Sequence, residues 1–180
     1  MKRLKQKLKS SAGMSLTELL CAVLILVLVS GGMATAVSLA ARQYQQSMRE
    51  SEAQILCSTL ETILRNELAY TTEIKLNDDD VKQFQSQTYA IKDSLSSIVI
   101  DDPDENGYGR LLLGNDTKNM DILGRGAYPH GLLVKIDEFT YDNLAHYFTV
   151  KLSVGCDGKD YATRKFQVLN ANQTSAEQLS

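Results

Sequence analysis

Proline is scarce in this chain of 180 residues, and the first of its two prolines is Pro103. Proline removes a backbone hydrogen-bond donor and its ring clashes with the preceding helical turn, so it breaks helices. No such residue interrupts the first half of the chain. A single long helix can therefore form there, and we predict one from about Ser15 to Thr72.

Histidine and cysteine are also few, with two and three residues respectively. The spacing of Cys21, Cys57 and Cys156 fits no zinc-binding pattern, and neither histidine belongs to a paired motif. The sequence has no glycine-rich phosphate loop and no nucleophile elbow. These absences favour a protein that is not an enzyme. Cys57 and Cys156 are open candidates for a disulfide bond if this part of the chain lies outside the cell.

Two stretches near the N-terminus have an unusual charge content: the first lacks acidic residues, and the second lacks charged residues of either sign. Residues 1–13 contain five basic residues and no acidic residue, and residues 19–41 contain no charged residue. Without the first stretch the chain holds 14 lysines and arginines against 22 aspartates and glutamates, a net charge of −8. Nonspecific binding to nucleic acids depends on clustered basic residues, so this acidic balance argues against it.

The uncharged run over 19–41 is long enough to cross a membrane. At about 1.5 Å per residue, a helix of this length spans roughly 35 Å, and the hydrocarbon core of a bilayer is about 30 Å thick. The basic residues precede the run, so the positive-inside tendency keeps residues 1–13 in the cytoplasm. We therefore expect a single-pass protein of the cytoplasmic membrane with its C-terminal part outside.

Three fates fit this N-terminal segment. It is an uncleaved anchor, a secretory signal peptide cut after Ala36, or a helix trimmed on the cytoplasmic side after Gly13. The second fate has a small-residue site in Ala34-Thr35-Ala36. Against it, the helical pattern continues without a break beyond that site. Under either of the first two fates the chain is a membrane-anchored or secreted binding domain.

The residues Gly13-Met14-Ser15-Leu16-Thr17-Glu18 carry the third interpretation. Together with the basic leader over 1–13 and the uncharged run, they resemble the N-terminus of type IV pilins and pseudopilins. The resemblance implies cleavage after Gly13 by a prepilin peptidase, N-methylation of Met14, and polymerisation through the N-terminal helix into a surface filament. It also implies other pilin subunits, an assembly ATPase and its membrane platform as partners, with membrane lipid around the helix before assembly.

Glu18 is the one carboxylate at the entrance to the uncharged run. A charged side chain in a membrane helix costs about 2.5–3.5 kcal/mol at the centre of the bilayer and less near its surface. By the family resemblance, Glu18 pairs with the amino group of Met14, in its own chain or in a neighbouring subunit. A misaligned subunit would bury an unpaired charge, so Glu18 is our candidate for setting the register of assembly.

Beyond the hydrophobic helix over 14–41, we expect the chain to divide into three parts. Apolar residues at steps of three and four predict an amphipathic helix over 42–72. Its apolar stripe consists of Tyr44, Met48, Ile55, Leu56, Leu60, Ile63, Leu64 and Leu68. Residues 73–169 are expected to form a β-rich globular part, and residues 170–180 a polar, frayed tail. The predicted fold class is α+β, with a small antiparallel sheet packed against the helix stripe in a pilin-like roll.

Alternating apolar residues locate the expected strands. These strands are Ser97–Ile100, Arg110–Leu113, Leu132–Ile136, Phe148–Val154 and Tyr161–Val168. The first two form a hairpin, and the last two meet across Asp157-Gly158, a dipeptide typical of tight hairpin turns. The four polar residues over 77–80 are expected to form a solvated turn that caps a short helix.

The loop between the first two strands matches the first half of a calcium-binding pattern, D-x-[DN]-x-[DN]-G. The matching residues are Asp102, Asp104, Asn106 and Gly107. The glutamate expected at the twelfth position is replaced by Leu113, so Asp101 or Glu105 would have to compensate. The same residue types also form ordinary polar turns. Both interpretations stay open, and no other cofactor is expected.

Overall fold

The computed structural model describes residues 15–85, 95–115 and 118–179. Within these ranges the chain forms one long α-helix, two 3-10 helices and nine strands. The helices are α1 (Leu16–Ala69), η1 (Arg125–Ala127) and η2 (Pro129–Gly131). The strands are β1 (Ile74–Asn77), β2 (Asp80–Phe84), β3 (Ser97–Asp101), β4 (Arg110–Gly114), β5 (Asn119–Asp121), β6 (Leu133–Asp142), β7 (Tyr147–Cys156), β8 (Lys159–Leu169) and β9 (Glu177–Gln178).

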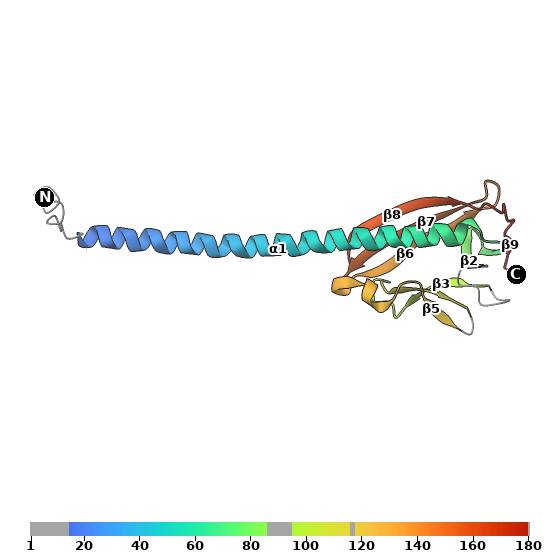
Figure 1. The fold of residues 1–180 in the computed structure, drawn as a ribbon, viewed down its shortest axis with the longest axis horizontal. Coiled ribbons are helices and arrows are strands. Elements are labelled where there is room, and N and C mark those ends of the chain that lie inside the picture. Colours follow the sequence, from blue (N-terminus) through green and yellow to red (C-terminus); the bar gives the residue numbers. More distant parts are fainter. Residues whose placement is uncertain (1–14, 86–94, 116–117, 180) are drawn as a thin grey trace, which may run out of the picture. The chain divides into compact units, whose positions relative to one another are not determined.

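The chain divides into two compact units, one that ends at Gln46 and one that begins at Ser47. We call them the N-terminal unit and the C-terminal unit. α1 contributes residues to both, and its observed range confirms the long helix predicted over 15–72. Figure 1 shows the helix and the strands, coloured along the sequence.

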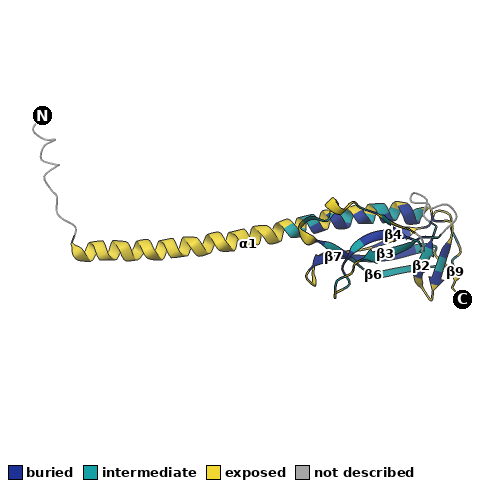
Figure 2. Ribbon diagram, turned by 90° about the horizontal axis from the view of Figure 1, so that it is seen from below, coloured by how far each residue is buried: buried dark blue, intermediate teal, exposed yellow. Residues whose placement is uncertain are grey.

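The N-terminal unit consists, in its described part, of α1 alone. All its residues from Ser15 to Gln46 are exposed. Figure 2 shows this part of the helix as exposed, in contrast to the part of α1 that belongs to the C-terminal unit. A helix with no other element to pack on buries none of its apolar surface, whatever its sequence.

In the C-terminal unit, one side of α1 packs against the strands to form the core. Leu60, Leu64 and Leu68 are at most 1% exposed, at the helical spacing of four residues. The side chains that meet them include Phe148, Val150, Leu152 and Val154 of β7, all fully buried. The predicted helix stripe is therefore confirmed over its central and C-terminal residues.

The prediction of the apolar stripe is wrong for its N-terminal residues. Tyr44, Met48 and Ile55 are exposed by 67%, 39% and 64%. In their place, Ala53 and Cys57 are fully buried and belong to the core. The large apolar residues suggested one face of the helix, but the small Ala53 and Cys57 allow the helix to approach the strands on a neighbouring face.

The nine strands of the described residues form two sheets. The larger sheet has the order β8-β7-β6-β2-β1-β9, and the smaller has the order β3-β4-β5. All neighbouring pairs are antiparallel except β1 and β9, which are parallel. Single bridges from Phe84 to Ser96 and from Gly109 to Val134 link the two sheets. The predicted α+β fold class is confirmed, with more strands than expected and one parallel pair.

The two predicted hairpins are confirmed, and the structure gives the register of their strands. β3 pairs with β4 from Ser97–Gly114 to Asp101–Arg110. β7 pairs with β8 down to Cys156–Lys159, so Asp157 and Gly158 form the two-residue turn. Both turn residues have positive φ, 51° and 73°, as a type I′ hairpin requires.

Strand β6 carries a β-bulge that the sequence analysis did not predict. The register with β7 shifts between Ile136 and Glu138. The extra residue, Asp137, accepts a hydrogen bond from the Ser153 hydroxyl at 2.8 Å. The apolar side chains of β6 consequently change phase, from Val134 and Ile136 to Phe139 and Tyr141. This change of spacing is visible in the sequence and is the signal that could have located the bulge.

The prediction that the turn over 77–80 caps a short helix is wrong. Residues Asp78 and Asp79 form the turn between β1 and β2, which pair as an antiparallel hairpin. The turn therefore leads into a strand and not into a helix. Asp78 has a φ of 57°, a conformation that aspartate adopts more readily than most residues.

The expectation of a frayed tail over 170–180 is also wrong for the described part of the tail, residues 170–179. Asn170 is fully buried, and its side chain donates to Thr71 O at 2.9 Å. The Ala171 N–H donates to Ala69 O at 2.7 Å, and the Asn172 side chain to Tyr70 O at 2.8 Å. These bonds satisfy carbonyls at the C-terminal end of α1, which have no partner inside the helix. The tail is thus held in place as the cap of α1, and β9 extends the sheet.

Candidate functional site

Glu18, the predicted assembly residue, lies in the first turn of α1 and is exposed. Its Oε2 accepts a hydrogen bond from the backbone N–H of Ser15 at 3.0 Å. Ser15 immediately precedes the helix, so this contact is half of a capping box. A negative charge is also favourable at this end of the helix dipole. Glu18 therefore stabilises the start of α1 within its own chain.

The predicted cleavage and methylation residues, Gly13 and Met14, lie outside the described residues. Ser15 is the first described residue, and its nitrogen forms the peptide bond with Met14. The contact between Glu18 and Ser15 N thus holds the carboxylate one residue away from the amino group that trimming after Gly13 would create.

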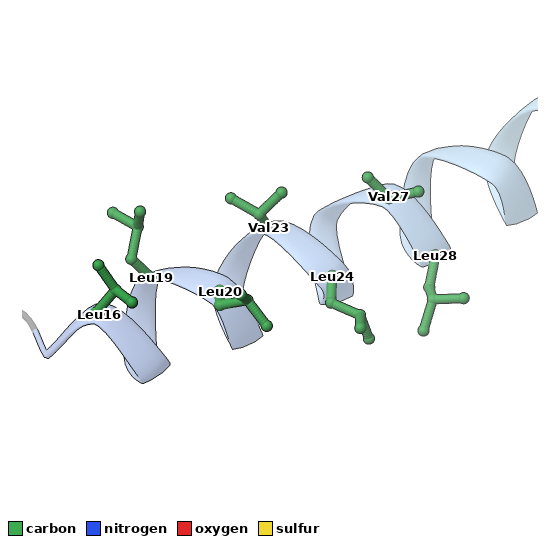
Figure 3. A pocket seen from close by; sticks show the side chains of 7 residues that line it. All are labelled: Leu16, Leu19, Leu20, Val23, Leu24, Val27 and Leu28. Carbon is green, nitrogen blue, oxygen red and sulfur yellow. The ribbon is translucent and has the colours of Figure 1, made fainter.

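The uncharged run forms an apolar surface that no described part of the N-terminal unit covers. From Leu19 to Leu39, its large apolar side chains are exposed by 52% to 70%. Figure 3 shows part of this surface, with Leu19, Val23 and Val27 on one side of the helix and Leu24 and Leu28 on another. The mean hydropathy of an 18-residue window of α1 reaches 2.4, so by length and composition the helix could cross a membrane.

The polar side chains of the run are satisfied by the helix itself. The Ser30 hydroxyl donates to Leu26 O at 2.7 Å, the Thr35 hydroxyl to Gly32 O at 2.8 Å, and the Ser38 hydroxyl to Ala34 O at 3.0 Å. A hydroxyl without a partner is costly to remove from water. These local bonds therefore make the run suitable for burial in lipid or against another protein.

The loop with the candidate calcium ligands is folded by its own hydrogen bonds. Asp104 Oδ1 accepts the backbone N–H groups of Asn106 and Tyr108, both at 2.9 Å. Asn106 lies against the β7–β8 turn, where a Cβ on Gly158 would come within 3.1 Å of its amide. Asp102 lies in the same loop with a φ of 48°.

One of the two residues that could have compensated for the missing glutamate is already engaged. Asp101 forms an ion pair with Arg110, its cross-strand partner in β4. Arg110 also lies 3.5 Å from an oxygen of Asp121 in β5. Among the described residues, no three histidine, cysteine or acidic side chains are placed to share a metal ion. Calcium binding by Asp102, Asp104 and Asn106 stays a prediction.

A contact between Tyr108 and Asp160 joins the same loop to β8. The Tyr108 hydroxyl donates to the Asp160 carboxylate. Burial and this carboxylate raise the pKa of Tyr108 well above its usual range. The two residues are 52 positions apart in the sequence, and nothing in the local pattern of either one marks the pair.

The three cysteines are free, so the structure contains no disulfide between Cys57 and Cys156. Cys57 is fully buried in the core, and burial raises the pKa of its thiol to about 11. Cys156 is also buried, whereas Cys21 is exposed on the uncharged run. A buried thiol with a raised pKa is unreactive, so Cys57 acts as a small core residue.

Each of the two histidines contacts one side chain. His130 Nδ1 lies 2.5 Å from Glu52 Oε2, which links η2 to α1 across 78 positions of sequence. His146 Nδ1 lies 3.3 Å from the Tyr141 hydroxyl. The His130 side chain is half-exposed.

Comparison with known proteins adds no assignment, because no family model, curated protein or solved structure matches this chain.

Proposed function

We propose that this chain is a type IV pilin-like structural subunit, either a pilin or a pseudopilin. It is inserted in the cytoplasmic membrane, trimmed after Gly13 by a prepilin peptidase and N-methylated at Met14. Its N-terminal helix then leaves the lipid and polymerises with other subunits into a filament at the cell surface. An assembly ATPase and its membrane platform drive this step, and the role of the chain is structural and not catalytic.

One observation carries the proposal: the uncharged run of α1 is exposed on every side, while the same helix forms the core of a folded α+β unit. Full burial of a leucine or valine side chain is worth about 1.5–3 kcal/mol. A run of such residues therefore requires lipid or other protein around it. A plain membrane anchor also meets this requirement, so the distinction depends on residues 13 to 18.

Glu18 supplies that distinction. In a membrane anchor Glu18 serves only to cap the start of the helix, and its charge opposes insertion. A polymerising helix gains from it, because Glu18 and the amino group of a trimmed Met14 attract each other within one chain or between neighbours. The contact between Glu18 and Ser15 N at 3.0 Å supports this pairing, since Met14 directly precedes Ser15 in the chain.

The decisive experiment is mass spectrometry of the N-terminal peptide of the protein from its native cell. The proposal predicts a peptide that begins with methylated Met14. A peptide that begins at Val37 would identify a secreted domain with an ordinary signal peptide, and an intact leader would identify an anchored domain. Either of these results overturns the proposal.

Three substitutions, one of them a control, extend this experiment. Gly13→Leu should block trimming, while Gly31→Ala, a change of glycine inside the run, should leave trimming unchanged. Glu18→Ala should spare insertion into the membrane but reduce incorporation into filaments beside wild-type copies. Normal incorporation of the Glu18→Ala chain would remove the role proposed for this residue.

A further inference from the structure

Within the C-terminal unit, the larger sheet has one face toward α1 and one face away from it. Side chains alternate between the two faces of a strand. The core residues of β7 begin with Phe148 and recur at every second position. The residues between them consequently lie on the face away from α1, which we call the outer face. In β7 these residues are Tyr147, Thr149, Lys151 and Ser153.

The strand register extends the outer face over β6 and β8. Thr149 lies opposite Thr140 of β6 and Gln167 of β8, and Tyr147 lies opposite Asp142 of β6. These five residues line a depression of about 630 Å³, which we call the outer-face depression. Pockets for small molecules commonly measure about 300–1,000 Å³, so the depression is large enough to hold one.

The rim of the outer-face depression is held in place by hydrogen bonds between distant segments. Gln178 of β9 lies on the rim, and its amide donates to Asp78 O at 2.9 Å. Asn143, in the β6–β7 turn, donates to Ala176 O at 3.2 Å and accepts the Ala176 N–H at 2.7 Å. The depression is therefore preformed. A ligand that binds there does not have to order these segments, which would otherwise reduce its affinity.

Most of the charge that lines the depression is compensated within the C-terminal unit. The charged residues are Asp79, Glu138, Asp142 and Lys165. Lys165 Nζ lies 2.7 Å from Glu138 Oε2. Asp142 Oδ1 accepts the backbone N–H groups of Ala145 at 2.9 Å and Leu144 at 2.8 Å, and these bonds lower the pKa of Asp142. The Asp79 carboxylate is left as the one charge without a partner among the described residues.

The outer-face depression offers hydrogen-bond donors and acceptors together. No described group bonds to the Thr140 hydroxyl, and the Gln167 amide makes only a long bond of 3.5 Å to Thr149 Oγ1. A hydroxyl and an amide each donate and accept, and the Asp79 carboxylate accepts. The half-buried Tyr147 adds an aromatic ring. Ligand hydroxyls match this mixture, because one hydroxyl can donate and accept at the same time.

We propose that the outer-face depression binds an uncharged carbohydrate. Asp79, Thr140 and Gln167 bind its hydroxyls, and the ring of Tyr147 packs against its C–H groups. A charged ligand fits less well, because Glu138 is already paired with Lys165. An apolar ligand would leave the polar groups of the depression without partners, which is costly.

This inference goes beyond the proposed function and does not depend on it. None of the described residues that line the depression belongs to α1. Neither insertion of α1 into a membrane nor assembly through its N-terminal part requires the outer face. The two proposals can therefore fail separately.

The first test measures saturation transfer by NMR from the full chain to small probes in solution. The protein is kept in micelles of a detergent that has no sugar headgroup. The carbohydrate probes are the methyl glycosides of glucose, galactose, mannose, N-acetylglucosamine and N-acetylgalactosamine, at millimolar concentration. The cationic probe is Nα-acetyl-lysine amide, which tests whether the acidic residues of the depression bind a positive charge instead.

We expect transfer to at least one glycoside and none to the lysine probe. A titration of the glycoside that binds then gives its dissociation constant. If no glycoside receives saturation, or if only the lysine probe does, the inference is overturned. Either of these results leaves the proposed function standing, and an uncleaved leader in the native protein would leave the inference standing.

The second test removes single hydrogen-bonding groups from the depression. Thr140→Val and Gln167→Leu keep the approximate size of each side chain, and each should weaken glycoside binding by roughly five- to tenfold. Gln54→Leu, the same change as Gln167→Leu at an exposed position of α1, should leave binding unchanged. A thermal melt of each variant shows whether the C-terminal unit is folded. Wild-type affinity in both folded depression variants overturns the inference.

Discussion

The two parts of α1 are alike in local structure and opposite in burial. Leu26 in the N-terminal unit is 66% exposed, and Leu60 in the C-terminal unit is fully buried. Both belong to one uninterrupted helix. The difference shows that the helix by itself buries almost nothing, and that burial depends on what packs against each part. In the C-terminal unit the chain provides its own cover, whereas no described part of the N-terminal unit covers the apolar side chains of its helix.

The largest effect that tests this comparison is expected from two matched leucine truncations. Leu60→Ala should destabilise the C-terminal unit by about 2–5 kcal/mol, because it leaves a cavity in a packed core. Leu26→Ala should leave the unfolding of that unit unchanged, since its side chain is exposed. Urea unfolding of the full chain in detergent, followed by tyrosine fluorescence, measures both. Equal effects would contradict the division into two units.

A smaller effect is expected at the C-terminal end of α1, where residues 170–174 cap the helix. Asn170 is buried and donates to Thr71 O at 2.9 Å. Asn170→Ala should cost about 1–3 kcal/mol, because it leaves a buried carbonyl with fewer partners. Asn172→Ala, at an exposed position, should cost less. Thermal unfolding of the two variants provides the comparison, and equal melting temperatures would show that the buried bond has no special weight.

Two glycine substitutions should act in opposite directions in the two regions. Gly158 has a φ of 73°, so Gly158→Ala forces a left-handed conformation on alanine and should destabilise the hairpin by about 1–2 kcal/mol. Gly31 lies inside the helix with open space around it, so Gly31→Ala should stabilise the helix by up to about 1 kcal/mol. Circular dichroism of α1 and unfolding of the C-terminal unit report the two effects separately. If both substitutions stabilise their regions, or both destabilise them, this account is contradicted.

A further effect, confined to alkaline pH, is a dependence of stability on the Cys57 thiol. Burial raises the pKa of Cys57 from 9.0 to about 11. Between these values the unfolded chain loses the thiol proton while the folded chain keeps it, so stability falls as pH rises through this window. The Cys57→Ala variant should lack this part of the slope, and the tyrosines contribute equally to both proteins. If urea titrations show that the free energy of unfolding falls equally from pH 9 to 11 in the wild-type chain and in Cys57→Ala, Cys57 plays no part.

Local patterns predicted most of the fold. The absence of proline and the spacing of apolar residues located α1 to within three residues at each end. The alternation over Phe148–Val154 identified β7, and Asp157-Gly158 identified the turn to β8. Each of these features is decided by neighbouring residues, through the helical or strand period and through turn geometry.

Features that depend on distant residues were not predicted. Ile55 has the spacing of a core residue, yet Ala53 and Cys57 take that place because their small side chains admit the sheet. The tail over 170–180 has a polar composition that predicts fraying, yet Asn170 and Asn172 in its described part bind carbonyls about 100 positions earlier in the chain. The candidate site follows the same division: Glu18 was placed correctly at the start of the helix, but its bond to Ser15 N required the structure.

The sequence by itself determined where the helix lies, where charge is absent and where the strands alternate, because these properties depend on residues close together in the chain. Only the tertiary structure decided which side of α1 is covered, how the tail caps it, and that Glu52, Glu61 and Arg65 have partners within the C-terminal unit. The physical reason is that burial and ion pairing are energies of contact between separate elements.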